Sequence, residues 1–202
     1  MVIPLAVIVP LFVVAVTAMW GEVEAKVLSD GGGAESGEHQ LSLPKKLEKH
    51  GLTLDRDVSD DPEFKNPELG WGDTQYVGWY KDEGGYEAYL YTGVNDSDLD
   101  ADTAADQALD AAIKDAAPAR QPKRHTFTPY GAGTTITCVV LPEATTGEGF
   151  VTPICAWSDD GSVATVIDKG SSSTVPSPKE YDLEGFAEDV ADVREDVRTP
   201  AD

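Results

Sequence analysis

The sequence predicts an α+β protein: an antiparallel sheet of five or six strands with two long helices on one face, preceded by an N-terminal transmembrane helix. Three observations lead to this prediction. Residues 74–117 and 150–198 each show the pattern of a β-hairpin followed by an amphipathic helix. A helix with one apolar stripe must bury it, and an antiparallel sheet offers an apolar face for doing so. The first 20 residues are apolar enough to enter a membrane.

The run from Val2 to Trp20 contains no charged side chain, and eleven of its residues are Val, Ile, Leu or Phe. As a helix it would be roughly 28 Å long, close to the ~30 Å hydrocarbon core of a bilayer. Residues 1–20 therefore predict a single-pass anchor, with the rest of the chain extracytoplasmic. The same run also fits a cleaved signal peptide ending at Val16-Thr17-Ala18, which would make the protein secreted.

A flexible acidic linker is predicted at 21–40 and one extracytoplasmic domain at 41–199. The linker prediction comes from Ser29–Gln40, which is polar, rich in glycine and free of large apolar side chains. The net charge of −22 makes nucleic acid and anionic membrane surfaces poor partners for the domain. Solubility explains this acidity, and so does a salty habitat.

The first half of the domain is predicted to contain a short helix and three strands. Ser42 as N-cap, Pro44 in the first turn and Gly51 as a stop predict the helix. Leu52–Leu54 predicts a short strand, and the proline-rich stretch 57–70 a loop. The other two strands are predicted to form a hairpin. They are Thr74–Tyr80 and Tyr86–Thr92, joined by the turn Lys81–Gly85.

A helix capped by Asp100 or Asp102 is predicted to run to about Ala117. Its apolar side chains recur at helical spacing and would form a buried stripe: Ala105, Ala108, Leu109, Ala112, Ile113 and Ala116. The basic segment Arg120–His125 follows it in an otherwise acidic chain. That segment is either a solvated loop or an internal partner for the acidic helices.

Three strands and a helix are predicted in the second half. The strands are Thr134–Leu141, Phe150–Trp157 and Ser162–Asp168, and the last is apolar on both faces, which indicates a central position. The closing helix starts at Asp182 and ends at Pro200. Both hairpins carry a tryptophan before an acidic, glycine-ended turn, so an internal duplication is a further hypothesis.

Two cysteines, Cys138 and Cys155, are the only ones in the chain. Outside the reducing cytoplasm such a pair is expected to form a disulfide. The rival interpretations are a metal pair and a catalytic thiol. Both lack evident partners, because His39, His50 and His125 show no ligand spacing.

The sequence contains no nucleotide-binding glycine motif, nucleophile elbow or paired-histidine motif, so it predicts no catalytic, cofactor-binding or metal-ligating residue. Asn95–Asp102 resembles a calcium loop, but Ala101 and Gln107 stand where an EF-hand needs Gly and Glu. A solvated loop and an acidic first helical turn are expected there instead. Ser171–Ser173 with His125 lacks the local signature of a catalytic triad.

Aromatic residues crowd the first hairpin. They favour a core with cross-strand pairs, and the alternative is a ligand surface, for instance for glycans. The residues are Trp71, Tyr76, Trp79, Tyr80, Tyr86, Tyr89 and Tyr91.

Three segments carry a family resemblance: LSLPKKLEKHGLTLDRD at 41–57, the Cys138 to Cys155 pair followed by AWSD at 156–159, and AEDVADVREDVR at 187–198. The chain resembles uncharacterised single-span or secreted proteins of actinobacteria, particularly streptomycete-type ones, over about residues 40–198. This resemblance implies a surface-exposed domain with a Cys–Cys bridge and no assigned activity. The chain departs from the family by lacking a basic N-terminal tail.

These observations together favour a non-catalytic, membrane-anchored extracytoplasmic domain that binds a cell-envelope component or another protein. The rival hypothesis is an envelope enzyme such as a hydrolase. A cleft with a hydrogen-bonded Ser/His/Asp set or paired carboxylates would favour the enzyme.

The predicted topology can be tested with protease. An outward-facing anchored domain should be removed when protease is added to intact cells or protoplasts, because the anchor leaves it outside the bilayer. Complete protection would reverse the orientation. A mature N-terminus at Met19 would show that the run is a signal peptide.

Overall fold

The computed structural model describes residues 39–61, 74–96, 98–116, 121–142, 151–170 and 177–200. The predicted span at 1–20 and the linker up to residue 38 lie outside these ranges. Residues 39 and 40, which the prediction assigned to the linker, belong to a strand. Within the described ranges, no helix combines the length and apolar character needed to cross a bilayer.

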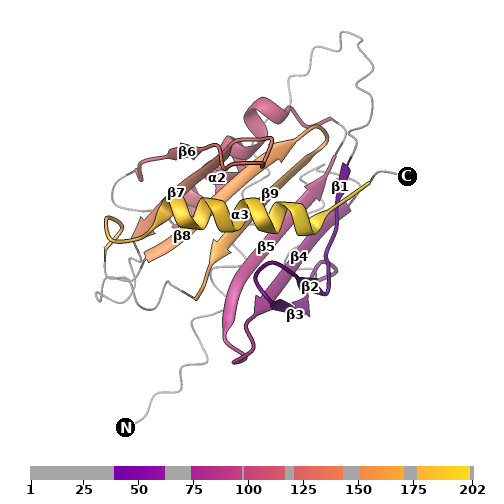
Figure 1. Ribbon diagram of the computed structural model, residues 1–202. Coiled ribbons are helices and arrows are strands. Elements are labelled where there is room, and N and C mark those ends of the chain that lie inside the picture. Colours follow the sequence, from indigo (N-terminus) through magenta and orange to yellow (C-terminus); the bar gives the residue numbers. More distant parts are fainter. Residues whose placement is uncertain are drawn as a thin grey trace.

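The α+β class is confirmed in the described residues, which form one large antiparallel sheet with the helices α2 and α3 (Figure 1). The sheet has eight strands rather than five or six, in the order β2-β3-β4-β5-β9-β8-β7-β6, and every pair is antiparallel. In chain order the strands are β2 (Lys46–Leu47), β3 (Leu52–Asp57), β4 (Thr74–Lys81), β5 (Glu87–Asn95), β6 (His125–Phe127), β7 (Ile136–Pro142), β8 (Val151–Asp159) and β9 (Ser162–Asp168).

All six predicted strands are present in the eight-stranded sheet, and its two strands that the sequence did not predict are the edge strands β2 and β6. They have only two and three residues, too few for a periodic pattern to be visible. The prediction that β9 is central is confirmed. It lies between β5 and β8, and all seven of its residues are buried.

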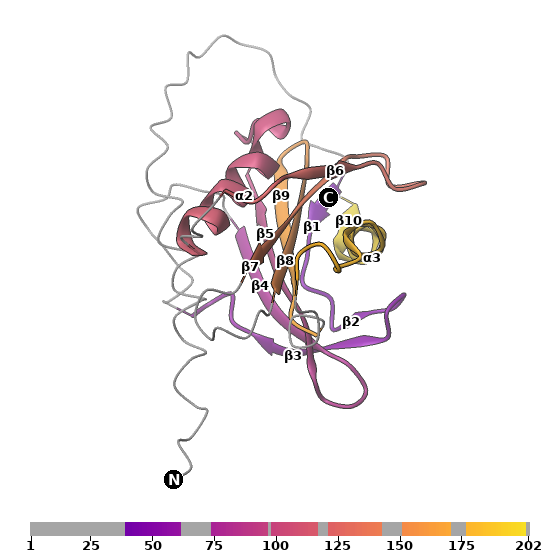
Figure 2. The same cartoon turned by 90° about the vertical axis from the view of Figure 1, so that its left-hand side faces the viewer.

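The two helices lie on opposite faces of the sheet, so the prediction that both pack on one face is wrong. Figure 2 shows α2 (Ala101–Ala116) and α3 (Leu183–Val197) on either side of the strands. Each helix covers its own cluster of buried side chains, called here the α2 core and the α3 core. Successive residues of β7 and β8 point into different cores: Val139 and Ile154 pack in the α2 core, whereas Cys138 and Cys155 pack in the α3 core. The central strands are apolar on both faces, and each face therefore needs its own cover.

The predicted helix at 42–51 is also wrong, because this segment makes tertiary contacts that a helix would prevent. The Tyr80 hydroxyl donates to the Pro44 carbonyl at 2.8 Å, and the Leu54 amide donates to the Lys45 carbonyl at 2.9 Å. Lys46 and Leu47 then pair with β3. Local propensity is weak compared with such contacts.

A second, two-stranded sheet joins β1 (His39–Leu41) to β10 (Arg198–Pro200) in antiparallel register. The Asn95 side chain fixes β1 to the end of β5, since its Oδ1 accepts from the Leu41 amide and its Nδ2 donates to the Leu41 carbonyl. Gly93 leaves room for this approach, because a Cβ there would collide with the Tyr91 hydroxyl and lie 3.1 Å from Leu41.

The duplication hypothesis receives no support from the geometry. Trp79 and Trp157 occupy the same place in the two predicted units, but Trp79 packs in the α2 core and Trp157 in the α3 core. The one-residue difference in spacing between the two hairpins matters, because a shift of one residue along a strand reverses the face.

Most of the aromatic residues of the first hairpin are structural. Trp79, Tyr80, Tyr89 and Tyr91 are buried, whereas Tyr86 is exposed. Tyr76 is half-buried and packs against the α3 core, and Trp71 lies outside the described residues. The hypothesis of a broad aromatic ligand surface on this hairpin is not supported.

The basic segment after α2 is an internal partner of that helix, one of the two alternatives. Arg124 forms ion pairs with Asp106 at 2.8 Å and with Asp110. Both acids lie on exposed turns of α2. Such partly exposed pairs contribute up to about 1 kcal/mol each.

Cys138 and Cys155 form the predicted disulfide. They are direct partners across β7 and β8, with Cα atoms 4.0 Å apart, and both are fully buried beneath α3. The bond joins residues 17 apart in sequence. It fits an oxidising, extracellular environment.

Replacing both cysteines with alanine should preserve the fold and lower the free energy of unfolding by about 2–4 kcal/mol, because the reduced unfolded chain gains entropy. Urea denaturation of the oxidised protein and of the double variant would measure the difference. Both thiols should resist alkylation in the native oxidised protein. Two freely alkylated thiols would contradict the structural account.

Candidate functional site

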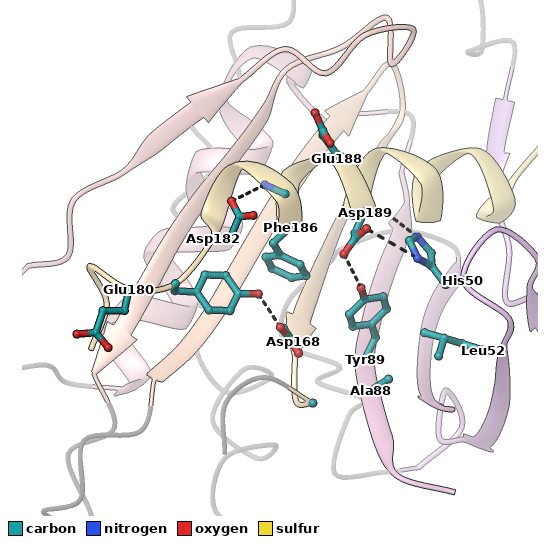
Figure 3. Close-up of a pocket in the computed structure, with 13 residues that line it drawn as sticks. His50, Leu52, Ala88, Tyr89, Asp168, Glu180, Asp182, Phe186, Glu188 and Asp189 are labelled. Atoms are coloured by element: carbon teal, nitrogen blue, oxygen red, sulfur yellow. Dashed lines mark hydrogen bonds and ion pairs between the residues drawn. The ribbon is translucent and has the colours of Figure 1, made fainter. Parts of the chain in front are cut away.

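An open pocket of about 670 Å³ lies between the N-terminal half of α3, the adjoining ends of β5 and β9, and the turn between β2 and β3 (Figure 3). Its lining is mainly acidic and aromatic. The residues are His50, Leu52, Ala88, Tyr89, Asp168, Gly170, Glu180, Tyr181, Asp182, Gly185, Phe186, Glu188 and Asp189.

The strand ends set the position of the pocket floor. Tyr89 of β5 and Asp168 of β9 are direct partners in the antiparallel register. Next to them the β4–β5 register shifts, because Lys81 pairs with Glu87 and leaves Ala88 as a bulge. The Ala88 carbonyl accepts from the amides of Lys169 and Gly170 at 2.8 and 3.2 Å. The bulge thus ends the regular sheet at the pocket, a common use of bulges.

The N-terminus of α3 supplies the facing wall. Asp182 caps the helix, with its Oδ1 accepting from the Gly185 amide at 3.0 Å. Phe186 and Asp189 follow on the inner side of the next turn, three residues apart and thus on one face. Figure 3 shows both side chains directed toward the strand ends.

The position of α3 is fixed at its other end by a buried ion pair. Arg194 is 4% exposed and donates to both carboxylate oxygens of Asp159, at 2.6 and 3.0 Å, and to the Ala132 carbonyl at 2.6 Å. Paired donors of this kind hold orientation as well as distance. The wall of the pocket is therefore attached to a rigid helix.

Two tyrosine–carboxylate hydrogen bonds cross the pocket. The Tyr181 hydroxyl donates to Asp168 Oδ2 at 2.6 Å, and the Tyr89 hydroxyl donates to Asp189 Oδ2 at 3.2 Å. Both phenol rings pack on Phe186, each with a centroid separation of 6.0 Å. The arrangement holds two acids and three aromatic rings in fixed positions.

His50 closes the side formed by the β2–β3 turn. Its Nε2 donates to the backbone carbonyl of Asp189 at 3.1 Å, and its Nδ1 lies 3.9 Å from Asp189 Oδ1. The ring also meets Tyr89 edge-on at 5.9 Å. Gly51 follows with a φ of 65°, which lets the chain turn back into β3.

Burial raises the pKa of the Asp189 carboxyl above its ordinary value, and the charges of Asp192 and Asp168 act in the same direction. His50 and the Tyr89 hydrogen bond oppose this rise. Burial likewise raises the pKa of Tyr89 and Tyr181, and the neighbouring carboxylates raise it further. Both phenols are therefore neutral hydrogen-bond donors at physiological pH.

Of the residues that the sequence analysis weighed for a functional role, His50 and Tyr89 lie in this pocket. Cys138 and Cys155 are in the core under α3. In the Asn95–Asp102 segment, Asp96 and Asp100 accept from the amides of Asp98 and Asp102, as in an ordinary loop and helix cap. The described residues contain no group of three or more His, Cys, Asp or Glu placed to hold a metal ion.

Comparison of the chain with protein-family models and with curated proteins gave no match.

The sequence interpretation missed the site because its residues come from four separate segments. Asp168 carried one usable signal, since it is an acid at the end of a strand that is otherwise buried on both faces. Asp189 carried none, because it lies among several acids of an acidic helix.

The raised pKa of Asp189 predicts how stability depends on pH. The folded state holds this proton more tightly than the unfolded state, so ionised Asp189 lowers stability at neutral pH, and the cost disappears as the pH falls toward the ordinary value of 3.8. Relative to Asp189→Asn, the wild type should therefore gain stability as the pH is lowered from about 7 to about 4. Urea unfolding of both proteins across this range measures the gap, which is the difference between their free energies of unfolding. Asp98→Asn, which removes one carboxylate at an exposed position, serves as the control. A constant gap for Asp189→Asn would contradict the prediction.

Proposed function

We propose that this chain is a non-catalytic, membrane-anchored extracytoplasmic domain that binds a cell-envelope component or a protein in the pocket beside α3. The observation that carries the proposal is the pocket itself. It is open, about 670 Å³ in volume, and built on strand ends and a helix whose positions are fixed. Concave sites with aromatic walls and a few oriented polar groups are typical of ligand binding.

The chemistry of the lining favours binding over catalysis. Among the described residues that line the pocket there is no Ser, Thr, Cys or Lys to act as a nucleophile. Asp168 and Asp189 each accept a hydrogen bond from a tyrosine. These bonds hold the carboxylates as fixed acceptors, which suits recognition.

The proposed location combines two arguments. The buried disulfide fits an oxidising compartment. The uncharged run at 2–20 would place the domain there while keeping it on the membrane. The resemblance to single-span or secreted actinobacterial proteins agrees with this location, and secretion after signal cleavage remains the alternative.

An envelope hydrolase is the second candidate, and one observation favours it. Asp168 and Asp189 line the same pocket, and Asp189 has a pKa raised by burial. Two carboxyl groups in one pocket can serve as general acid and general base in catalysis. This alternative predicts turnover of a bound envelope component.

Capture from envelope extract tests the proposal. The tagged full-length chain in detergent should retain a specific component, and Ala88→Phe, which fills the pocket, should abolish its retention. Thr126→Phe adds the same ring on the exposed edge strand β6 and should leave retention unchanged. Equal retention by both variants would contradict the pocket as the site. Conversion of the captured component, lost in Asp189→Asn, would favour the hydrolase.

A further inference from the structure

We propose that the pocket beside α3 recognises a donor-rich organic cation, a primary ammonium or guanidinium group, carried by the ligand. This inference rests on the proposed binding function and assigns the chemistry of its ligand. Three properties of the pocket lead to it: the direction of its hydrogen bonds, its aromatic walls and the sign of its charge.

The pocket offers acceptors, and five donors of its described lining already bond within the chain. The hydroxyls of Tyr89 and Tyr181 donate to carboxylates, and the amides of Gly170 and Gly185 donate within the chain. The Nε2 of His50 donates to the Asp189 carbonyl. The Asp189 carboxylate has about four lone-pair positions, of which the Tyr89 hydroxyl occupies one, and Glu180 and Glu188 are exposed carboxylates in the same lining. A ligand with several N–H donors therefore fits better than one with acceptors.

The aromatic walls provide the second part of the argument. Tyr89 and Tyr181 of the lining both pack on Phe186, and their interplanar angles to it of 50° and 84° present ring faces in different directions. Ring faces attract cations and also pack against the methylene groups of an amine or guanidine. A metal ion has no methylene groups to pack against these rings, and the described part of the chain has no cluster suited to one.

The negative charge of the pocket lining favours a positively charged ligand. Five carboxylates line the pocket, at Asp168, Glu180, Asp182, Glu188 and Asp189, and no lysine or arginine does so among the described residues. Asp168 is 5% exposed and Asp189 is half-buried, so solvent screens these two less than it screens surface acids. An anionic ligand would be repelled at this site.

The probe is N-acetyl-lysine methylamide, with its Nε-acetylated form as the neutral control and tetramethylammonium as a cation without N–H donors. Calorimetric titration into the full-length chain in detergent, at low ionic strength, should show binding of the lysine derivative. The neutral form should bind at least about tenfold more weakly, because it lacks the charge and two of the donors. Tetramethylammonium should also bind more weakly, and added salt should weaken the lysine derivative.

Two sets of variants locate the binding. Asp168→Asn/Asp189→Asn should weaken the lysine derivative by at least about tenfold. Asp98→Asn/Asp160→Asn removes the same charge from exposed turns and should change the affinity less than about twofold. Glu180→Gln/Glu188→Gln leaves both tyrosine–aspartate hydrogen bonds in place. It therefore tests the role of the pocket carboxylates even if the variant Asp168→Asn/Asp189→Asn does not fold. It should weaken binding severalfold.

Equal affinity for the charged and neutral probes, or equal losses in the pocket and control variants, would overturn this inference. Absence of amine binding together with Ala88-dependent capture from envelope extract would overturn it while leaving the proposed function in place. Arginine amide and a short lysine-containing peptide in the same titration distinguish a guanidinium ligand from an ammonium ligand, and a free amine from a protein side chain.

Discussion

The structure depends on the burial of its central strands on both faces. β9 has seven consecutive buried residues, and its partners β5 and β8 are nearly as enclosed. A sheet of this kind cannot leave one side to water, so it needs two independent covers. α2 and α3 provide them, on opposite sides. The disulfide, the aromatic core and the packing of β1 all belong to the α3 side, where the cover is most elaborate.

The candidate site is a consequence of this two-sided arrangement. α3 lies across one face of the sheet, beside the place where β5 carries a bulge at Ala88 and β9 ends in Asp168. The helix is held at Arg194 by the ion pair with Asp159. Side chains of its first turns face the start of β5 and the end of β9, and the pocket lies between them.

The sequence was most informative where periodicity is strong. The six long strands, α2 and α3 follow from their apolar patterns, and the pairing of Cys138 with Cys155 follows from their number and compartment. The patterns do not contain the layer assignment, because an amphipathic helix does not encode which face of a two-sided sheet it covers. The apolar character of both faces in 162–168 was the available clue. The segment at 42–51 carries helix capping signals, but contacts from Tyr80 and Leu54 override them. The pocket could not be predicted, because His50, Tyr89, Asp168 and Asp189 are brought together only by the tertiary fold.

The pairing of β1 with β10 has a mechanical consequence. His39 pairs with Pro200 at the outer end of the β1–β10 ladder. A force on the chain N-terminal to His39 therefore acts on this pair first and on the following pairs in turn. Leu41 is the exception, because two bonds from Asn95 tie it to the main sheet. If residues 2–20 hold the protein to a membrane, tension along the tether would act first on this short ladder and then on the two Asn95 hydrogen bonds.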